Sequence, residues 1–167
     1  CIDEELLFEF LEATQEKALE KLKKIHGANY RIKIITRINQ KLKEQTTVKG
    51  IPTGGIVNLL RKGIEDNAVK LKLFFEKPNQ SLNEDLVKLY DKNCFSVMRQ
   101  VHYSTKNNNS LDMVVFINGI PVITFELKNE LTKQSVKDAI KQYQKNRDPK
   151  EELFKLGRCL VHFAVDT

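Results

Sequence analysis

The sequence predicts an α/β (α+β) fold in which a mixed central sheet is flanked by helices. Three observations lead to this prediction. Helical periodicity fills the first third of the 167-residue chain, paired apolar runs around Asn118-Gly119 indicate a buried hairpin, and one more helix and one more apolar strand follow that hairpin. The predicted order is helices, a strand, a helix, three strands, a helix and a last strand. A chain of this length is most simply one compact domain with its own core.

The N-terminal region, residues 1–50, is predicted to be helical. From Asp3 to about Ile25 apolar residues recur at helical spacing, and His26-Gly27 is a stop signal. A second pattern over about Tyr30–Glu44 is amphipathic, and its basic face is either simply solvated or in contact with phosphates. A linker with a proline and glycines follows over Thr46–Gly55, so residues 51–167 are predicted to form the main core.

The remaining elements are predicted from periodicity and from start and stop signals. Each helix has an apolar stripe, and each strand is a short β-rich run bounded by polar or turn residues. Ser135 and Asp138 form the pattern of a capping box at the start of the last helix. Helices are expected over about 56–66, 84–91 and 135–145, and strands over about 69–75, 95–103 and 158–165.

Three charged residues stand at the ends of the central hairpin. Its apolar runs, Met113–Ile117 and Val122–Leu127, are continuous rather than alternating, which indicates strands covered on both faces. Asp112 nevertheless precedes the first run, and Glu126 and Lys128 close the second. Because charged side chains are rarely buried unless they are paired or bind a metal, this convergence indicates a site.

The register of the hairpin decides whether the three charges share one face. Glu126 and Lys128 do, because they are two residues apart on a strand. A plain two-residue turn at Asn118-Gly119 would place Asp112 opposite Phe125, on the other face, whereas a three-residue loop would place it opposite Thr124, on the same face. We therefore predict an odd-length loop or a bulge, which Pro121 also favours because it lacks an N–H group.

Two carboxylates from adjacent strands suit a hard divalent cation such as Mg²⁺, with Mn²⁺ as a substitute. Asp112 and Glu126 would be its ligands and the Leu127 carbonyl a further one, while Lys128 would orient a water molecule or stabilise charge on phosphorus. These groups would equip a metal-dependent phosphodiesterase. The alternative, which spacing alone leaves open, is an ion pair between Glu126 and Lys128 at the solvated end of the hairpin.

The spacing Asp112, thirteen residues, Glu126-Leu127-Lys128 is similar to the PD-(D/E)xK nuclease motif, with Leu111 where that motif often has proline. The surrounding runs Arg99–Ser104, Ser110–Asn129 and Asp138–Gln144 resemble the nuclease domain of the R subunit of type I restriction enzymes, from about Gln80 onward. The resemblance implies a restriction-endonuclease-like α/β/α core. It also implies that Asp112 and Glu126 are metal carboxylates and Lys128 the catalytic lysine.

The same resemblance implies a Gln-x-x-x-Tyr pair on the helix after the lysine strand. Gln142 stands where the glutamine is expected and would help to orient the lysine or the DNA. Asn146 stands where the tyrosine is expected, and Tyr143 would face elsewhere on a helix. The catalytic set implied for this chain is therefore Asp112, Glu126, Lys128 and Gln142.

The resemblance thus implies a Mg²⁺-dependent endonuclease domain that acts on double-stranded DNA. Methyltransferase and specificity subunits would be its partners, and ATP would act only in motor domains beyond Thr167. The alternatives are a non-catalytic DNA-binding or assembly domain with a degenerate nuclease core, or a repair or RNA-processing nuclease of the same superfamily. The intact trio favours an enzyme, since a binding module does not need those three side chains on one face.

Composition sets further expectations. The net charge of +6 suits a polyanionic partner, and the three cysteines lack metal-ligand spacing, which favours a reducing, cytoplasmic setting. No secretory signal and no run of about 20 apolar residues is present, so no membrane association is expected. No Walker A motif occurs, and the start at Cys1 suggests a fragment of a longer chain.

Overall fold

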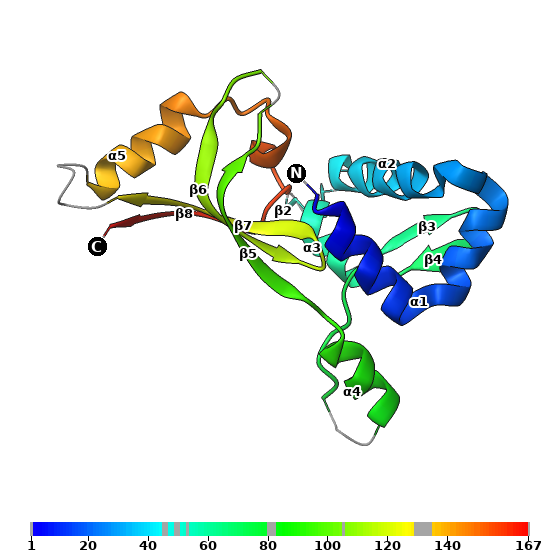
Figure 1. Cartoon of the computed structure of the whole chain (residues 1–167). Helices are drawn as coiled ribbons and strands as arrows, with labels where there is room; N and C mark the ends of the chain where they lie inside the picture. Colours follow the sequence, from blue (N-terminus) through cyan, green and yellow to red (C-terminus); the bar gives the residue numbers. More distant parts are fainter. Residues whose placement is uncertain are drawn as a thin grey trace.

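The computed structural model describes residues 2–44, 47–48, 51–52, 54–79, 83–104, 106–128 and 135–166. A four-stranded sheet with a helix on one face forms one part of the molecule, and the N-terminal helices with a small hairpin form the other (Figure 1). The elements in chain order are α1 (Glu4–His26), η1 (Gly27–Asn29), α2 (Tyr30–Lys43), β1 (Thr47–Val48), β2 (Ile51–Pro52), α3 (Gly55–Lys62), β3 (Ile64–Asp66), β4 (Val69–Leu71), α4 (Glu84–Asp91), β5 (Phe95–His102), β6 (Ser110–Ile117), β7 (Ile120–Lys128), α5 (Val136–Lys141), the π-helix η3 (Gln142–Asn146), η4 (Glu152–Phe154) and β8 (Val161–Asp166).

Helix α1 begins and ends where its sequence signals predict. The Asp3 side chain accepts a hydrogen bond from the Leu6 N–H at 3.2 Å, and the helix stops at His26 because Gly27 takes a positive φ of 57°. The helix kinks at Gln15, whose side-chain amide makes two bonds with the Lys72 backbone, one to its carbonyl at 2.8 Å and one from its N–H at 2.7 Å. The kink therefore ties α1 to the strand end after β4.

Substitution of Gln15 by alanine is expected to destabilise the chain by about 1–2 kcal/mol, because both Lys72 backbone groups lose their partner. The matched control is Gln40→Ala on α2. The Gln40 side chain is exposed and accepts a hydrogen bond from Arg37, and its removal is expected to change stability by less than about 0.5 kcal/mol. Urea denaturation followed by circular dichroism measures both. Equal effects of the two substitutions would contradict a structural role of the Gln15 amide.

One apolar core joins the N-terminal helices to the hairpin. It draws on α1, α2, α3, β3 and β4, and it also takes in two residues of β7. The N-terminal helices thus share a core with the segment that follows the predicted linker, and the boundary at residue 50 stays a prediction. The buried members are Leu7, Phe8, Phe10, Leu11, Leu19, Leu22, Ile34, Ile38, Leu42, Ile56, Leu59, Leu60, Ile64, Leu71, Leu73, Ile120 and Val122.

The helix expected over residues 56–66 ends earlier, so that prediction is wrong at residues 64–66. Gly63 takes a φ of 70° at the C-terminus of α3, and the chain continues as β3. Strand β3 then pairs antiparallel with β4. Gly63 acts as a stop because a left-handed backbone conformation interrupts the helix at little cost for a residue without Cβ.

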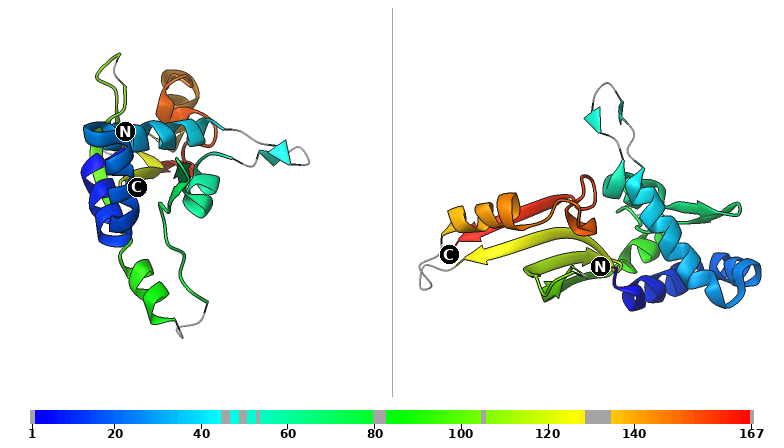
Figure 2. Two further views of the ribbon diagram at one scale, coloured as in Figure 1. Left: turned by 90° about the vertical axis from the view of Figure 1, so that its right-hand side faces the viewer. Right: turned by 90° about the horizontal axis from the view of Figure 1, so that it is seen from above.

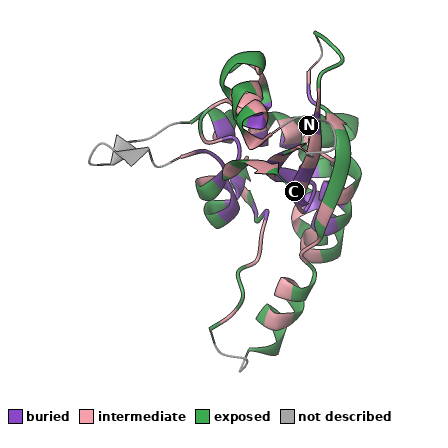
Figure 3. Cartoon of the chain, turned by 90° about the vertical axis from the view of Figure 1, so that its left-hand side faces the viewer, coloured by how far each residue is buried: buried purple, intermediate pink, exposed green. Residues whose placement is uncertain are grey.

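The central sheet has the strand order β5-β6-β7-β8. Strands β5, β6 and β7 pair antiparallel, whereas β8 pairs parallel to β7. The chain segment that connects β7 to β8 contains α5. The sheet is therefore mixed, as the sequence predicts. Figure 2 shows α5 lying along one face of this sheet. The edge strand β5 is largely exposed (Figure 3).

The turn between β6 and β7 anchors the sheet to the rest of the molecule. Asn118 and Gly119 both take positive φ, 50° and 77°, and Ile117 pairs with Ile120 across a two-residue turn. The Asn118 side chain is buried and bonds to Leu73 O at 2.9 Å and to Cys94 N at 2.7 Å. The Gly119 carbonyl accepts a bond from Asp3 N at 2.8 Å.

A bulge lies just beyond this turn. Phe116 pairs with Pro121 and Val115 with Ile123, so Val122 is an extra residue of β7 without a partner in the register. The turn is thus shorter than the three-residue loop considered from the sequence. The predicted bulge shifts the register by one residue, as that loop would have done.

No helix in the described ranges has both the length and the apolar character required to cross a bilayer.

Candidate active site

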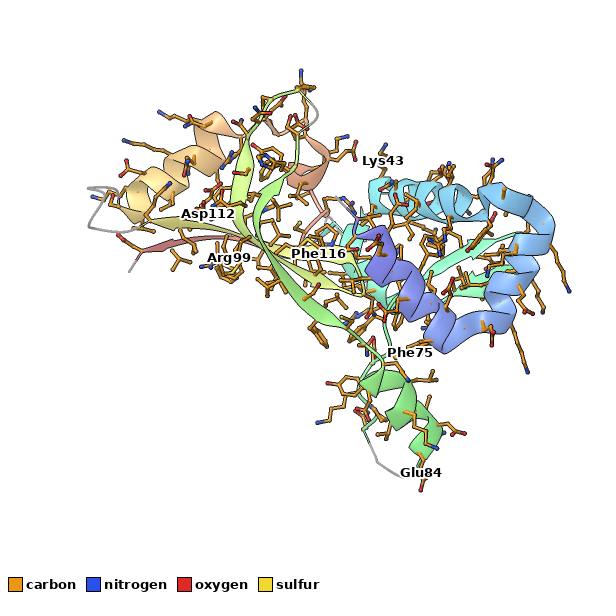
Figure 4. All side chains as sticks on the ribbon, viewed as in Figure 1. Lys43, Phe75, Glu84, Arg99, Asp112 and Phe116 are labelled. Carbon is orange, nitrogen blue, oxygen red and sulfur yellow. The ribbon has the colours of Figure 1, made fainter. Side chains whose placement is uncertain are left out.

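The bulge brings Asp112 and Glu126 to the same face of the sheet. The register beyond it runs Val114 with Thr124 and Met113 with Phe125, and its continuation sets Asp112 opposite Glu126. Lys128 follows two residues after Glu126 on the same strand and therefore points to the same face. Asp112 lies on the part of the sheet beside α5, whereas Phe116 lies closer to α1 (Figure 4).

Asp112 is held by two hydrogen bonds. Its Oδ2 accepts the backbone N–H of Leu127 at 2.7 Å, and its Oδ1 accepts from the Gln100 side chain at 3.3 Å. Gln100 takes a φ of 51°, which is unusual for a residue other than glycine and interrupts the β5 ladder opposite Asp112. A carboxylate has about four acceptor positions, so these two bonds leave Asp112 able to bind a cation.

Glu126 is the most deeply buried charged residue of the site, with 1% of its surface exposed. Its Oε1 accepts a hydrogen bond from the Nη2 group of Arg147, with which it forms an ion pair. In the described part of the chain, the ion-pair partner of Glu126 is thus Arg147 and not Lys128. The charges of Asp112 and Lys128 nevertheless act on Glu126.

Burial raises the pKa of the Glu126 carboxyl above its ordinary value, and the charge of Asp112 acts in the same direction. The hydrogen bond and charge of Arg147, and the charge of Lys128, act in the opposite direction but do not outweigh burial. For Arg147, burial is the largest influence and favours a lower pKa, but the hydrogen bonds and charges of Glu126 and Tyr103 together outweigh it, so the pKa is raised. The carboxylate therefore depends on nearby cations for its negative charge.

Lys128 and Gln142 complete the predicted catalytic set. Lys128 is half-buried, and its charge acts to lower the pKa of Glu126, although burial keeps that pKa above its ordinary value. The hydrogen bond from the Ser135 backbone lowers the pKa of Asp138 at the start of α5, and Lys128 adds a smaller contribution in the same direction. Gln142 begins the π-helix, and its side-chain oxygen is buried without a hydrogen-bond partner in the described ranges. Leu127, between Glu126 and Lys128, pairs with Val165 of β8. Among the described residues no hydrogen bond joins Gln142 to Lys128.

Two features near the site were not anticipated from the sequence. Arg147 follows the π-helix, beyond the predicted end of α5, and no motif marks it. Beside Glu126, the Thr124 hydroxyl bonds to Tyr143 Oη at 2.9 Å and to His162 Nδ1 at 2.6 Å. Tyr143, which the sequence does not place at the position of the motif tyrosine, contacts Thr124 of β7. Burial raises its pKa well above the ordinary value.

The donor set fits a hard divalent cation. Asp112 and Glu126 supply carboxylate oxygens from facing positions on adjacent strands, and the Leu127 carbonyl lies between Glu126 and Lys128. Within the described ranges no group of three or more His, Cys, Asp or Glu side chains is placed to hold a metal. A cation such as Mg²⁺ keeps several waters and needs only one or two carboxylates.

A family profile described as the N terminus of the type I restriction enzyme R protein matches residues 4–167. The chain belongs to this family. It is 32% identical over 149 residues to a protein of Methanocaldococcus jannaschii named "Putative type I restriction enzyme MjaIXP endonuclease subunit". The match covers 78% of this chain but only 14% of that relative. No solved structure gives a significant match.

Membership of the R-protein family agrees with the resemblance found in the nuclease motif and its surroundings. It also extends over the N-terminal helices, which the motif does not reach, since the matched range begins at the start of α1. The helices and the sheet of this chain are therefore parts of one family unit.

Proposed function

We propose that the chain is the nuclease module of a type I restriction R subunit and that it hydrolyses phosphodiester bonds of double-stranded DNA with Mg²⁺, for which Mn²⁺ can substitute. The observation that carries the proposal is the bulge at Val122, because it brings two carboxylates and a lysine to one face of adjacent strands. Membership of the R-protein family supports the proposal, as does the relative that is named as an endonuclease subunit.

In this proposal Asp112 and Glu126 hold the cation, with the Leu127 carbonyl as a further ligand. The bound cation would supply a water of lowered pKa and offset phosphate charge. Lys128 orients the attacking water and stabilises charge that develops on the phosphoryl oxygens. Gln142, whose side-chain oxygen has no partner among the described residues, helps to orient Lys128 or the DNA.

The groups proposed for catalysis do not read bases, since carboxylates and a cation act on any phosphodiester. Sequence choice is therefore assigned to methyltransferase and specificity subunits of the restriction complex. ATP-driven translocation is assigned to motor domains of the longer R subunit. The net charge of +6 supports a polyanionic substrate.

Metal binding by the 167-residue chain tests the proposal. Calorimetry with Mn²⁺ compares the unmodified chain with Asp112→Asn and Glu126→Gln, and circular dichroism checks the fold. Each substitution is expected to weaken binding by more than about 100-fold, beyond the 10–100-fold typical of losing only an outer partner. Asp91→Asn, at the exposed end of α4, is the control and is expected to leave binding unchanged.

Unchanged binding in both variants would place the cation elsewhere and contradict the proposed site. If the unmodified chain bound no Mn²⁺ even with a DNA duplex present, the nuclease proposal would fail. Retained duplex binding would then favour a non-catalytic DNA-binding or assembly domain.

A further inference from the structure

Arg147 is tied to three consecutive strand segments at the edge of the candidate site. Its Nη1 donates to Tyr103 Oη at 2.8 Å just after β5, and its Nη2 donates to the Ser110 carbonyl of β6 at 2.8 Å. The same Nη2 bonds to Glu126 of β7. The guanidinium also lies 5.3 Å from the centre of the Tyr103 ring, in cation–π contact. Only 8% of the Arg147 side chain is exposed.

The backbone of Arg147 is fixed as well. Its N–H donates to the Gln142 carbonyl at 2.9 Å, five residues back, which closes the π-helix. Single π-turns inside helices are frequent at functional sites. Here the π-turn fixes the backbone position from which the guanidinium reaches Tyr103, Ser110 and Glu126.

Arg147 occupies one oxygen of Glu126 and leaves the other. Its contact is to Oε1, whereas Oε2 accepts no hydrogen bond from the described residues. A metal-binding carboxylate is commonly held by such an outer partner, which fixes its orientation and the oxygen it presents. A guanidinium suits this task because it is always charged and its donors form a rigid fork.

We propose that Arg147 is a positioning residue that holds Oε1 of Glu126 so that Oε2 is presented to the divalent cation shared with Asp112. This inference rests on the proposed nuclease function. The competing arrangement is a gate, in which Arg147 blocks Glu126 and must withdraw before a cation binds. The anchors on Tyr103 and Ser110 favour positioning, because withdrawal would break three hydrogen bonds of a buried side chain.

The test measures Mn²⁺ affinity by calorimetry, at one fixed pH, for the unmodified chain, Arg147→Met and Arg147→Lys. Arg147→Met is expected to weaken binding by about 10–100-fold, as for the loss of other outer partners. Arg147→Lys is expected to recover part of that affinity, because it keeps a cation at Oε1 but cannot serve all three partners at once. Thermal melting of each variant reports stability separately.

Arg158→Met is the matched control. Arg158 is also a buried arginine, but in the described ranges it forms no ion pair with a carboxylate. Its substitution is expected to lower the melting temperature without changing Mn²⁺ affinity. A change in affinity caused by general loosening of the fold would appear in both methionine variants, and this result would overturn the assignment of Arg147.

The other outcomes are also decisive. Unchanged affinity in folded Arg147→Met would make Arg147 a purely structural tie, and increased affinity would make it a gate; either overturns the inference while the nuclease proposal stands. Absence of Mn²⁺ binding in the unmodified chain, with or without duplex DNA, would remove the proposed function and this inference together.

Discussion

Replacement of Lys128 by methionine is expected to reduce DNA cleavage by the complete restriction enzyme by about 10²–10³-fold, the loss typical of removing one preorganised donor from developing charge. Methionine keeps most of the side-chain length but removes the ammonium group. The charge of Lys128 acts on Glu126 inside the site, so its loss removes a cation close to the expected phosphate position.

Binding of Mn²⁺ separates the role of Lys128 from that of the carboxylates. The Lys128→Met variant is expected to retain it, because the ammonium group is not a metal ligand. Lys137→Met, an exposed lysine on α5, is the control and is expected to cleave DNA normally. Full cleavage by Lys128→Met, measured on a DNA carrying the recognition site, would remove Lys128 from the catalytic set.

Substitution of Gly119 by alanine is expected to destabilise the chain by about 3–4 kcal/mol, near the upper end for single substitutions. Gly119 has a φ of 77°, and a Cβ there would lie 2.2 Å from the Asp3 carbonyl oxygen and 2.7 Å from Leu7 N. Both are backbone atoms of the first turn of α1 and its cap, so relief requires the helix to move away from the hairpin. That movement would also break the bond from Asp3 N to the Gly119 carbonyl.

Gly27→Ala gives a matched comparison. Gly27 also has a positive φ, 57°, but a Cβ there would meet nothing within 4 Å. Its substitution is therefore expected to cost only about 1 kcal/mol, the price of the conformation alone. Urea denaturation followed by circular dichroism measures both variants. Similar losses of stability would show that contact between α1 and the turn contributes little.

Local sequence signals predicted the geometry of the hairpin that carries the candidate site. The Asn118-Gly119 pair specifies a turn that needs two positive φ angles, and the structure has both. The charged residues at the hairpin ends can share one face only if the register shifts by one residue, and the bulge at Val122 produces that shift. The sequence did not decide whether a longer loop or a bulge would produce this register. That choice depends on tertiary packing, because Gly119 of the turn packs closely against α1.

The partner of Glu126 could not be predicted in the same way. Arg147 lies twenty-one residues along the chain from Glu126, after a helix whose last turn is a π-helix rather than an α-helix. Helical periodicity does not predict such a turn, because a π-turn contains one residue more than an α-helical turn and so changes the direction in which the following side chains point. The sequence also gives no sign of the positive φ of Gln100, whose side chain donates a hydrogen bond to Asp112.

The sequence by itself determined the mixed α/β class, the central hairpin and the three charged residues at its ends, because periodicity, turn residues and side-chain spacing act locally. Only the tertiary structure decided which groups surround those charges. Arg147, Gln100 and the N-terminus of α1 reach the hairpin from distant parts of the chain. Their positions follow from how the elements pack, and packing depends on the whole molecule rather than on any one segment.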